Sequence, residues 1–104
     1  MNRTSAPYQE FIRKARRMFE ERGCELAASE STLNGEYLLF TRNGVLHLVY
    51  CLPLEMLVTT IEIQICRAAQ SRFRAKSSTV LAPNQFSPAA LQAAQSLGIK
   101  CERV

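Results

Sequence analysis

Residues 36–52 read EYLLFTRNGVLHLVYCL, two apolar runs separated by a tight-turn signal. Asn43 and Gly44 both tolerate the positive φ of a type I′ turn, so the sequence predicts a β-hairpin with strands over 36–41 and 45–51. The second strand is almost wholly apolar, a pattern typical of burial on both faces of a sheet. We therefore expect residues 45–51 at the centre of the sheet.

The chain around the hairpin alternates helical patterns, short β-branched runs and turn residues. Ser5 and Pro7 suit the first turn of an amphipathic helix, and Ser87-Pro88 begins another. The predicted elements are a helix ended by Gly23, a strand over 24–28, a loop over 29–35, the hairpin, a helix over 54–73, a strand over 77–81, a helix ended by Gly98 and a strand over 99–104. This order, αβββαβαβ, predicts an α/β sandwich in which helices flank a mixed sheet of about five strands.

Residues 54–73 carry two conflicting patterns. Positions 58–65 alternate and are β-branched, as in a strand, but a run of about twenty residues without glycine or internal proline favours a helix. As a helix, the segment has an uncharged outer face formed by Met56, Thr59, Ile63, Cys66 and Gln70. Its predicted core stripe is formed by Leu54, Leu57, Val58, Ile61, Ile65, Ala68 and Ala69.

The composition indicates one globular domain. The chain has 104 residues, 47% of them hydrophobic, and only residues 1–6 look like a loose N-terminus. No apolar run reaches the ~18 residues of a membrane helix, and the N-terminal residues lack the pattern of a secretory signal. We therefore expect a cytoplasmic protein without membrane contact.

The thiols and the histidine give no metal signal. The four cysteines form no C-x-x-C pair, and His47 follows no ligand spacing, so we predict no metal site. We interpret the cysteines as reduced and mostly buried, with a disulfide framework as the alternative. His47 is interpreted as a core or edge histidine rather than a catalytic one.

The order of these pieces has a counterpart in a known family. Residues 79–90, TVLAPNQFSPAA, combine a strand, a Phe-Ser turn and an alanine-rich helix, and Leu97-Gly98-Ile99 leads into the last strand. Together with the hairpin and the first two helices, they resemble the Mrr-type branch of the restriction-endonuclease-like superfamily over nearly the whole chain. The resemblance implies a restriction-endonuclease-like α/β sandwich.

The resemblance also implies where a nuclease site would lie. Active members hold Mg²⁺ with an acid on the first helix, an aspartate at the start of the hairpin and a Glu/Gln-x-Lys at its end. Mg²⁺ takes oxygen ligands, and the lysine stabilises charge on the scissile phosphate. Here Glu10 and Glu36 match the acidic positions, whereas Tyr50 and Leu52 occupy the Glu/Gln and Lys positions.

Neither missing group can be recovered by shifting the alignment. All nine acidic residues are glutamate, and the next lysine downstream of the hairpin is Lys76. We therefore predict a degenerate, catalytically inactive member without a cofactor. The alternative is a small Mg²⁺-dependent DNA endonuclease that uses Glu10 and Glu36, with Glu25 and Glu30 as further candidates and a basic residue that has migrated.

Two non-catalytic roles stay open. The net charge of +4, with Arg67, Arg72, Arg74 and Lys76 at the end of the long helix, favours contact with nucleic-acid phosphates. The charged residues of the first helix, by contrast, pair at i,i+4 as on an ordinary solvated face. The uncharged outer face of the long helix favours a protein partner, most simply in a homodimer, through Met56, Thr59, Ile63 and Cys66. The alternative explanation of this uncharged face is that the long helix is sandwiched between the sheet and the first helix. Of the possible roles, we favour an interaction or scaffold module.

Overall fold

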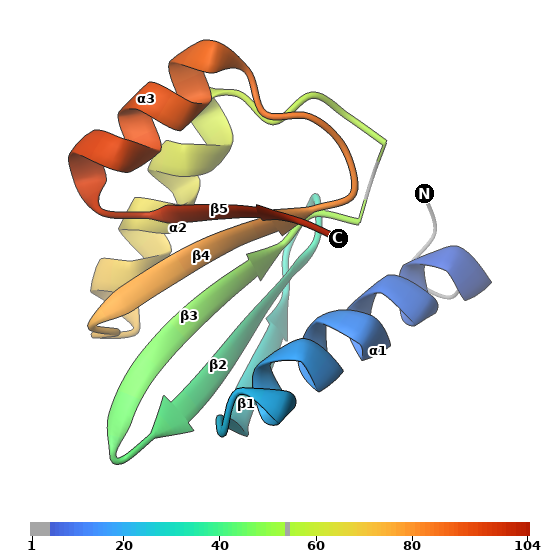
Figure 1. The fold of residues 1–104 in the computed structure, drawn as a ribbon, viewed down its shortest axis with the longest axis vertical. Helices are drawn as coiled ribbons and strands as arrows, with labels where there is room; N and C mark the ends of the chain where they lie inside the picture. The colour runs from blue at the N-terminus through green and yellow to red at the C-terminus, as the bar shows by residue number, and fades with distance from the viewer. Residues whose placement is uncertain (1–4, 54) are drawn as a thin grey trace.

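The computed structural model describes residues 5–53 and 55–104, which form three helices and five strands (Figure 1). The elements are α1 Ala6–Glu21, β1 Glu25–Ser31, β2 Glu36–Arg42, β3 Val45–Cys51, α2 Thr60–Arg72, β4 Ser77–Ala82, α3 Pro88–Leu97 and β5 Lys100–Arg103. The predicted α/β order is therefore confirmed. Of the predicted loose terminus, residues 1–4 lie outside the described residues, whereas Ser5 caps α1 and Ala6 begins it.

The five strands form one mixed sheet in the order β1-β2-β3-β4-β5. The first three strands are antiparallel, and β4 and β5 run parallel to β3. The hairpin turn has φ of 55° at Asn43 and 77° at Gly44, the positive values that the sequence predicts. The strand β3 is central, as its apolar composition indicates.

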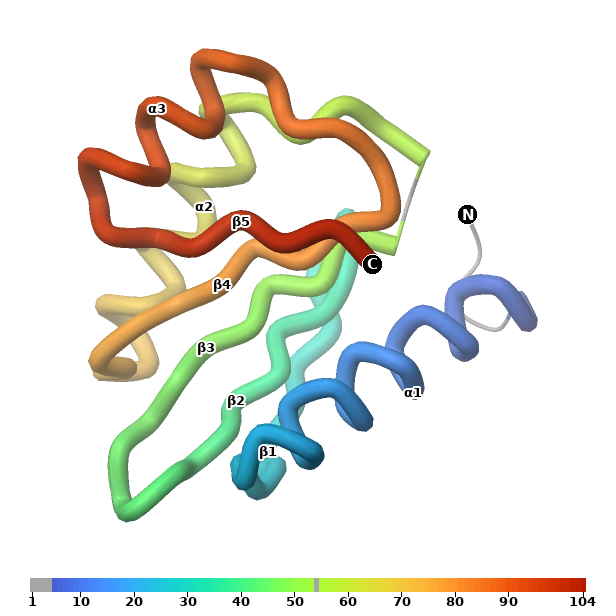
Figure 2. The backbone as a smooth tube through the Cα atoms, viewed as in Figure 1, coloured from blue at the N-terminus to red at the C-terminus, as the bar shows by residue number. Residues whose placement is uncertain are grey.

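Helices cover the two faces of the sheet unequally (Figures 1 and 2). The helix α1 packs on β1 and β2 on one face, whereas α2 and α3 pack against each other and against β3, β4 and β5 on the other. Side chains alternate between the faces along each strand. Leu38 and Phe40 of β2 therefore pack with α1, and Tyr37 and Leu39 join the core on the α2 side.

Two predicted element boundaries are wrong. The strand predicted over 24–28 extends to Ser31, which pairs with Glu36, because β1 is an exposed, polar edge strand that carries little hydrophobic signal. The helix predicted over 54–73 begins only at Thr60, and Leu54 lies outside the described residues. Thr59 caps this helix, and the Glu62 carboxylate accepts hydrogen bonds from the Thr59 N–H and hydroxyl in a capping box.

The predicted face of α2 is also wrong. Ile63 and Cys66, expected on the outside, are fully buried, whereas Leu57 and Ile61, expected in the core, are 52% and 61% exposed. Isoleucines at every second position cannot share one helical face. Because both faces are apolar and nearly uncharged, periodicity alone does not say which one packs on the sheet.

The thiols and helix lengths agree with the composition. All four cysteines are free thiols, Cys51 and Cys66 buried and Cys24 and Cys101 half-buried. Among residues 5–53 and 55–104, no helix has both the length and the apolar content needed to cross a membrane.

Candidate functional site

The mouth of the hairpin is where the family resemblance implies a nuclease site. Glu36 lies directly opposite Cys51, and its Oε1 accepts a hydrogen bond of 3.2 Å from the Tyr8 hydroxyl. Directly opposed residues share a face of the sheet, so Val49 and Cys51 are the β3 side chains nearest Glu36 on its face. Both are fully buried. Burial, followed by the Glu36 charge, raises the pKa of the Cys51 thiol, which keeps it protonated and unsuited to bind a metal.

Tyr50 and Leu52 lie on the other face, in the core beneath α2 and α3. Their exposed fractions are 1% and 0%. The Tyr50 ring packs at 5.0 Å from the ring of Tyr37, and burial raises the pKa of Tyr50 to about 12. The hairpin positions implied by the resemblance therefore do not converge with Glu36.

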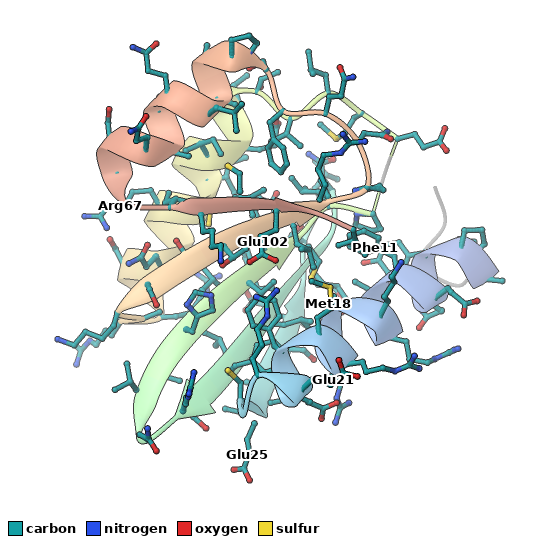
Figure 3. The ribbon with its side chains drawn as sticks, viewed as in Figure 1. Phe11, Met18, Glu21, Glu25, Arg67 and Glu102 are labelled. Carbon is teal, nitrogen blue, oxygen red and sulfur yellow. The ribbon has the colours of Figure 1, made fainter. Side chains whose placement is uncertain are left out.

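The other candidate acids are dispersed. Glu10 is exposed on α1 and borders a depression, with Lys14 and Val104, that does not include Glu36. Glu30 pairs with Arg72, and Glu25, labelled in Figure 3, lies at the opposite end of β1 from the Glu36 pairing. Within residues 5–53 and 55–104, no three His, Cys, Asp or Glu side chains are placed to hold a metal ion.

The basic cluster predicted at the end of α2 is partly engaged within the chain. Arg72 forms an ion pair with Glu30, and its guanidinium lies 4.1 Å from the centre of the Phe73 ring. Arg67, labelled in Figure 3, is exposed on α2, and Arg74 and Lys76 are exposed in the turn before β4. The backbone of Lys76 is tied to β3 by a hydrogen bond to the Leu46 carbonyl.

A groove lined by both charged and apolar groups opens on the α1 side of the sheet, where β3, β4 and β5 begin. We call it the His47 groove; its volume is ≈ 390 Å³. Its charged lining comes from the C-cap of α1, from β2 and from β5, which contribute Arg22, Arg42, Lys100 and Glu102.

His47 lies in the groove between two hydroxyl groups of β4. Its Nδ1 is 2.6 Å from Ser77 Oγ, and its Nε2 is 2.9 Å from Thr79 Oγ1. The ring also stacks on Phe19 of α1 at 5.6 Å. Burial lowers the pKa of His47, opposed by the Glu102 carboxylate, so the ring is neutral at pH 7 and donates through one nitrogen while accepting at the other.

One carboxylate in the groove is shared by two cations. Glu102, labelled in Figure 3, accepts two hydrogen bonds of 3.0 Å from Arg22. It also forms an ion pair with Lys100, whose Nζ is 3.1 Å from Oε1 of Glu102. The hydrogen bond from Arg22 lowers the pKa of Glu102 despite partial burial. Arg42 forms no ion pair within the described residues.

Comparison with known proteins supports the fold. No family model matches the chain, and no curated protein matches it significantly. A crystal structure of AF1548, described as a protein of unknown function, matches with a TM-score of 0.65 and 18% sequence identity. The match covers 93% of this chain and 57% of that one, so the chain spans just over half of its structural neighbour. At this identity the likeness concerns the fold alone.

The His47 groove is not predicted from the sequence because its residues come from five elements. Arg22 and Lys100 are far apart in the chain, and neither belongs to a basic run or a motif. The usable signal was His47, the only histidine, inside an otherwise apolar central strand. A polar residue in that position needs partners, and the structure shows them on β4.

Proposed function

We propose that this chain is a catalytically inactive, nuclease-like domain that acts as an interaction or scaffold module. The supporting observation is the composition of the face that Glu36 shares with β3. On that face the β3 side chains nearest Glu36 are Val49 and Cys51, which are fully buried and apolar. Metal-dependent phosphodiester hydrolysis needs further oxygen ligands and a cation beside Glu36, and neither side chain supplies them.

Exposed apolar side chains of the α2–α3 layer, and of the residues just before α2, support a binding role. Leu57, Ile61 and Leu91 are 52%, 61% and 48% exposed, although each is a large apolar side chain. They replace the outer face expected from Met56, Thr59, Ile63 and Cys66. We propose a protein partner for this layer, with a second copy of the chain as the simplest one. Nucleic-acid contact through Arg67, Arg72, Arg74 and Lys76 is less well supported, because Arg72 is already paired.

The first test is for nuclease activity. We expect no cleavage of plasmid, single-stranded DNA or RNA by the pure protein in Mg²⁺ or Mn²⁺, read on gels over several hours. The control is Glu36→Gln, which preserves the size of the side chain and removes its charge. Cleavage that is present in the parent protein and lost in Glu36→Gln would contradict the proposal, whereas equal cleavage by both would identify a contaminant.

The second test is for self-association. At ~100 µM, well above ordinary dimer dissociation constants, we expect sedimentation velocity to show a dimer. Ile61→Lys places a charge on the exposed part of α2 and should shift the protein to monomer, whereas Leu33→Lys, at a 94% exposed position in the β1–β2 loop, should leave the dimer intact. A parent protein that stays monomeric would rule out the homodimer and leave only a different protein as partner.

A further inference from the structure

We propose that the His47 groove binds a phosphate monoester, the group carried by a nucleotide or by the end of a phosphorylated nucleic-acid strand. The groove is remote from the mouth of the hairpin. Arg42 pairs with Val45 at one end of the hairpin and Glu36 pairs with Cys51 at the other, about 20 Å away along the strand. The proposal therefore does not depend on the nuclease resemblance or on the scaffold function.

The charge of the groove matches a dianion. Within the described residues, its lining holds three permanent cations, Arg22, Arg42 and Lys100, against the single carboxylate of Glu102, a net charge of +2 while His47 is neutral. Glu102 is paired with Arg22 and Lys100, so the excess positive charge of the lining includes the whole charge of the unpaired Arg42. A phosphate monoester carries about −1.5 to −2 at pH 7, which neutralises this lining.

Arg42 is the cation best placed to meet a ligand. It is exposed and forms no ion pair with any of the described residues, so no internal bond has to break when an anion arrives. A guanidinium presents planar donors that match two phosphate oxygens.

The hydroxyls around His47 supply further donors. A neutral imidazole has one N–H, so it donates to one of the two hydroxyls and accepts from the other. The hydroxyl that accepts from His47 keeps its own proton free for a ligand. Once His47 is protonated, both ring nitrogens donate, so the proton of the exposed Ser77 hydroxyl becomes free for a ligand, whereas Thr79, 1% exposed, lies out of a ligand's reach.

The size and the remaining lining favour an ester over bare phosphate. A volume of ≈ 390 Å³ lies in the usual range of small-molecule sites and exceeds what a phosphate group fills. Phe19, Cys24 and Val45 supply apolar surface beside the charged groups. This surface suits the carbon atoms of an attached sugar.

Binding should depend on pH through His47. The charged and titratable groups around it in the groove are Arg22, Arg42, Lys100, Glu102 and the Cys24 thiol. Burial lowers the pKa of the His47 ring below its usual 6.5, and an anion in the groove favours the protonated ring. The affinity for an anion whose own charge stays constant should therefore rise as pH falls from 7.5 towards 5.

The experiment is a titration of the full chain followed by amide NMR shifts. Inorganic phosphate and a nucleoside 5′-monophosphate should both give saturable shifts at groove residues, with the monophosphate binding at least threefold more tightly. Arg42→Gln should weaken both ligands about tenfold or more, as expected for the loss of a charge-assisted hydrogen bond. Arg13→Gln removes the same charge from the exposed surface of α1, outside the groove, and should change the affinity for neither ligand. No saturable shift at 20 mM phosphate, or equal loss in both variants, would overturn the proposal.

Sulfate isolates the role of His47, because it stays dianionic between pH 5 and 7.5. The parent protein should bind sulfate at least threefold more tightly at pH 5 than at pH 7.5. His47→Gln keeps one donor and one acceptor but cannot titrate, so its sulfate affinity should be independent of pH. A variant with unchanged pH dependence would refute the role of His47.

A pair of oligonucleotides distinguishes a free nucleotide from the end of a nucleic-acid strand as the source of the phosphate. A 5′-phosphorylated thymidine dodecamer that shifts the groove resonances more strongly than the nucleoside monophosphate assigns the site to strand ends. A stronger response to the monophosphate assigns it to free nucleotides. Equal binding of the phosphorylated and unphosphorylated dodecamers, with no response to the monophosphate, would exclude a monoester site.

Discussion

Leu52→Lys is expected to lower the free energy of unfolding by about 4 kcal/mol or more and to confer no nuclease activity. The substitution restores a lysine at the position that the family resemblance implies. Leu52 is fully buried in the core with Tyr50 and Val58, however, rather than on the face of Glu36. A buried lysine has its pKa lowered by several units, and each unit corresponds to about 1.4 kcal/mol.

Urea denaturation followed by circular dichroism measures this loss, with Leu33→Lys in the exposed β1–β2 loop as the matched control, expected within about 0.5 kcal/mol of the parent. The lowered lysine pKa also sets how the destabilisation depends on pH. The unfolded chain keeps the lysine proton up to about pH 10.4, whereas the folded chain loses it at lower pH. The difference in the free energy of unfolding between Leu52→Lys and the parent should therefore narrow as pH rises from 7 towards 10. A stable variant that cleaves DNA with Mg²⁺ would show that residue 52 reaches a catalytic position.

Gly35→Ala is expected to destabilise the protein by about 3 kcal/mol, at the upper end for overpacking. An added Cβ at Gly35 would lie 1.9 Å from the carbonyl oxygen of Cys51 and 3.3 Å from Cδ of Pro53. Because the first contact is with backbone of β3, it cannot be relieved by turning a side chain. Gly35 is also held by Thr32, which exchanges hydrogen bonds with it across the β1–β2 turn.

The matched control is Gly44→Ala in the hairpin turn. Gly44 has φ of 77° but no atom within 4 Å of an added Cβ, so only backbone strain of about 1–2 kcal/mol is expected. Urea midpoints of the two variants and the parent give the comparison. A loss at Gly35 no larger than the loss at Gly44 would show that the close approach to Cys51 is easily relaxed.

Elements with local signals were predicted well from the sequence. The Asn43-Gly44 turn, the Ser87 cap before Pro88 and the left-handed Gly98 after α3 all occur where the sequence places them. The polar edge strand β1 and the start of α2 were placed less well. The first is stabilised by pairing with β2 rather than by its own composition, and the second depends on the Thr59–Glu62 capping box within an ambiguous run.

The candidate sites show the same division. The apolar character of Tyr50 and Leu52 is visible in the sequence, but their placement on the face opposite Glu36 follows from the register of β2 against β3. A side chain's face depends on pairing, because one step along a strand reverses it. The four charged residues of the His47 groove come together only because the C-terminal end of α1, the end of β2 and the start of β5 meet on one face of the sheet, where Arg22 pairs with Glu102.

The sequence alone determined the order of the elements, the hairpin turn, the helix caps and the apolar central strand. Each depends on backbone preferences or on periodicity within a few neighbouring residues. Tertiary structure alone decided which face of α2 is buried, how far β1 extends and where Arg22, Arg42, His47 and Glu102 meet. These features depend on contacts between distant segments, whose energy exists only once the sheet has formed and the helices have packed on it.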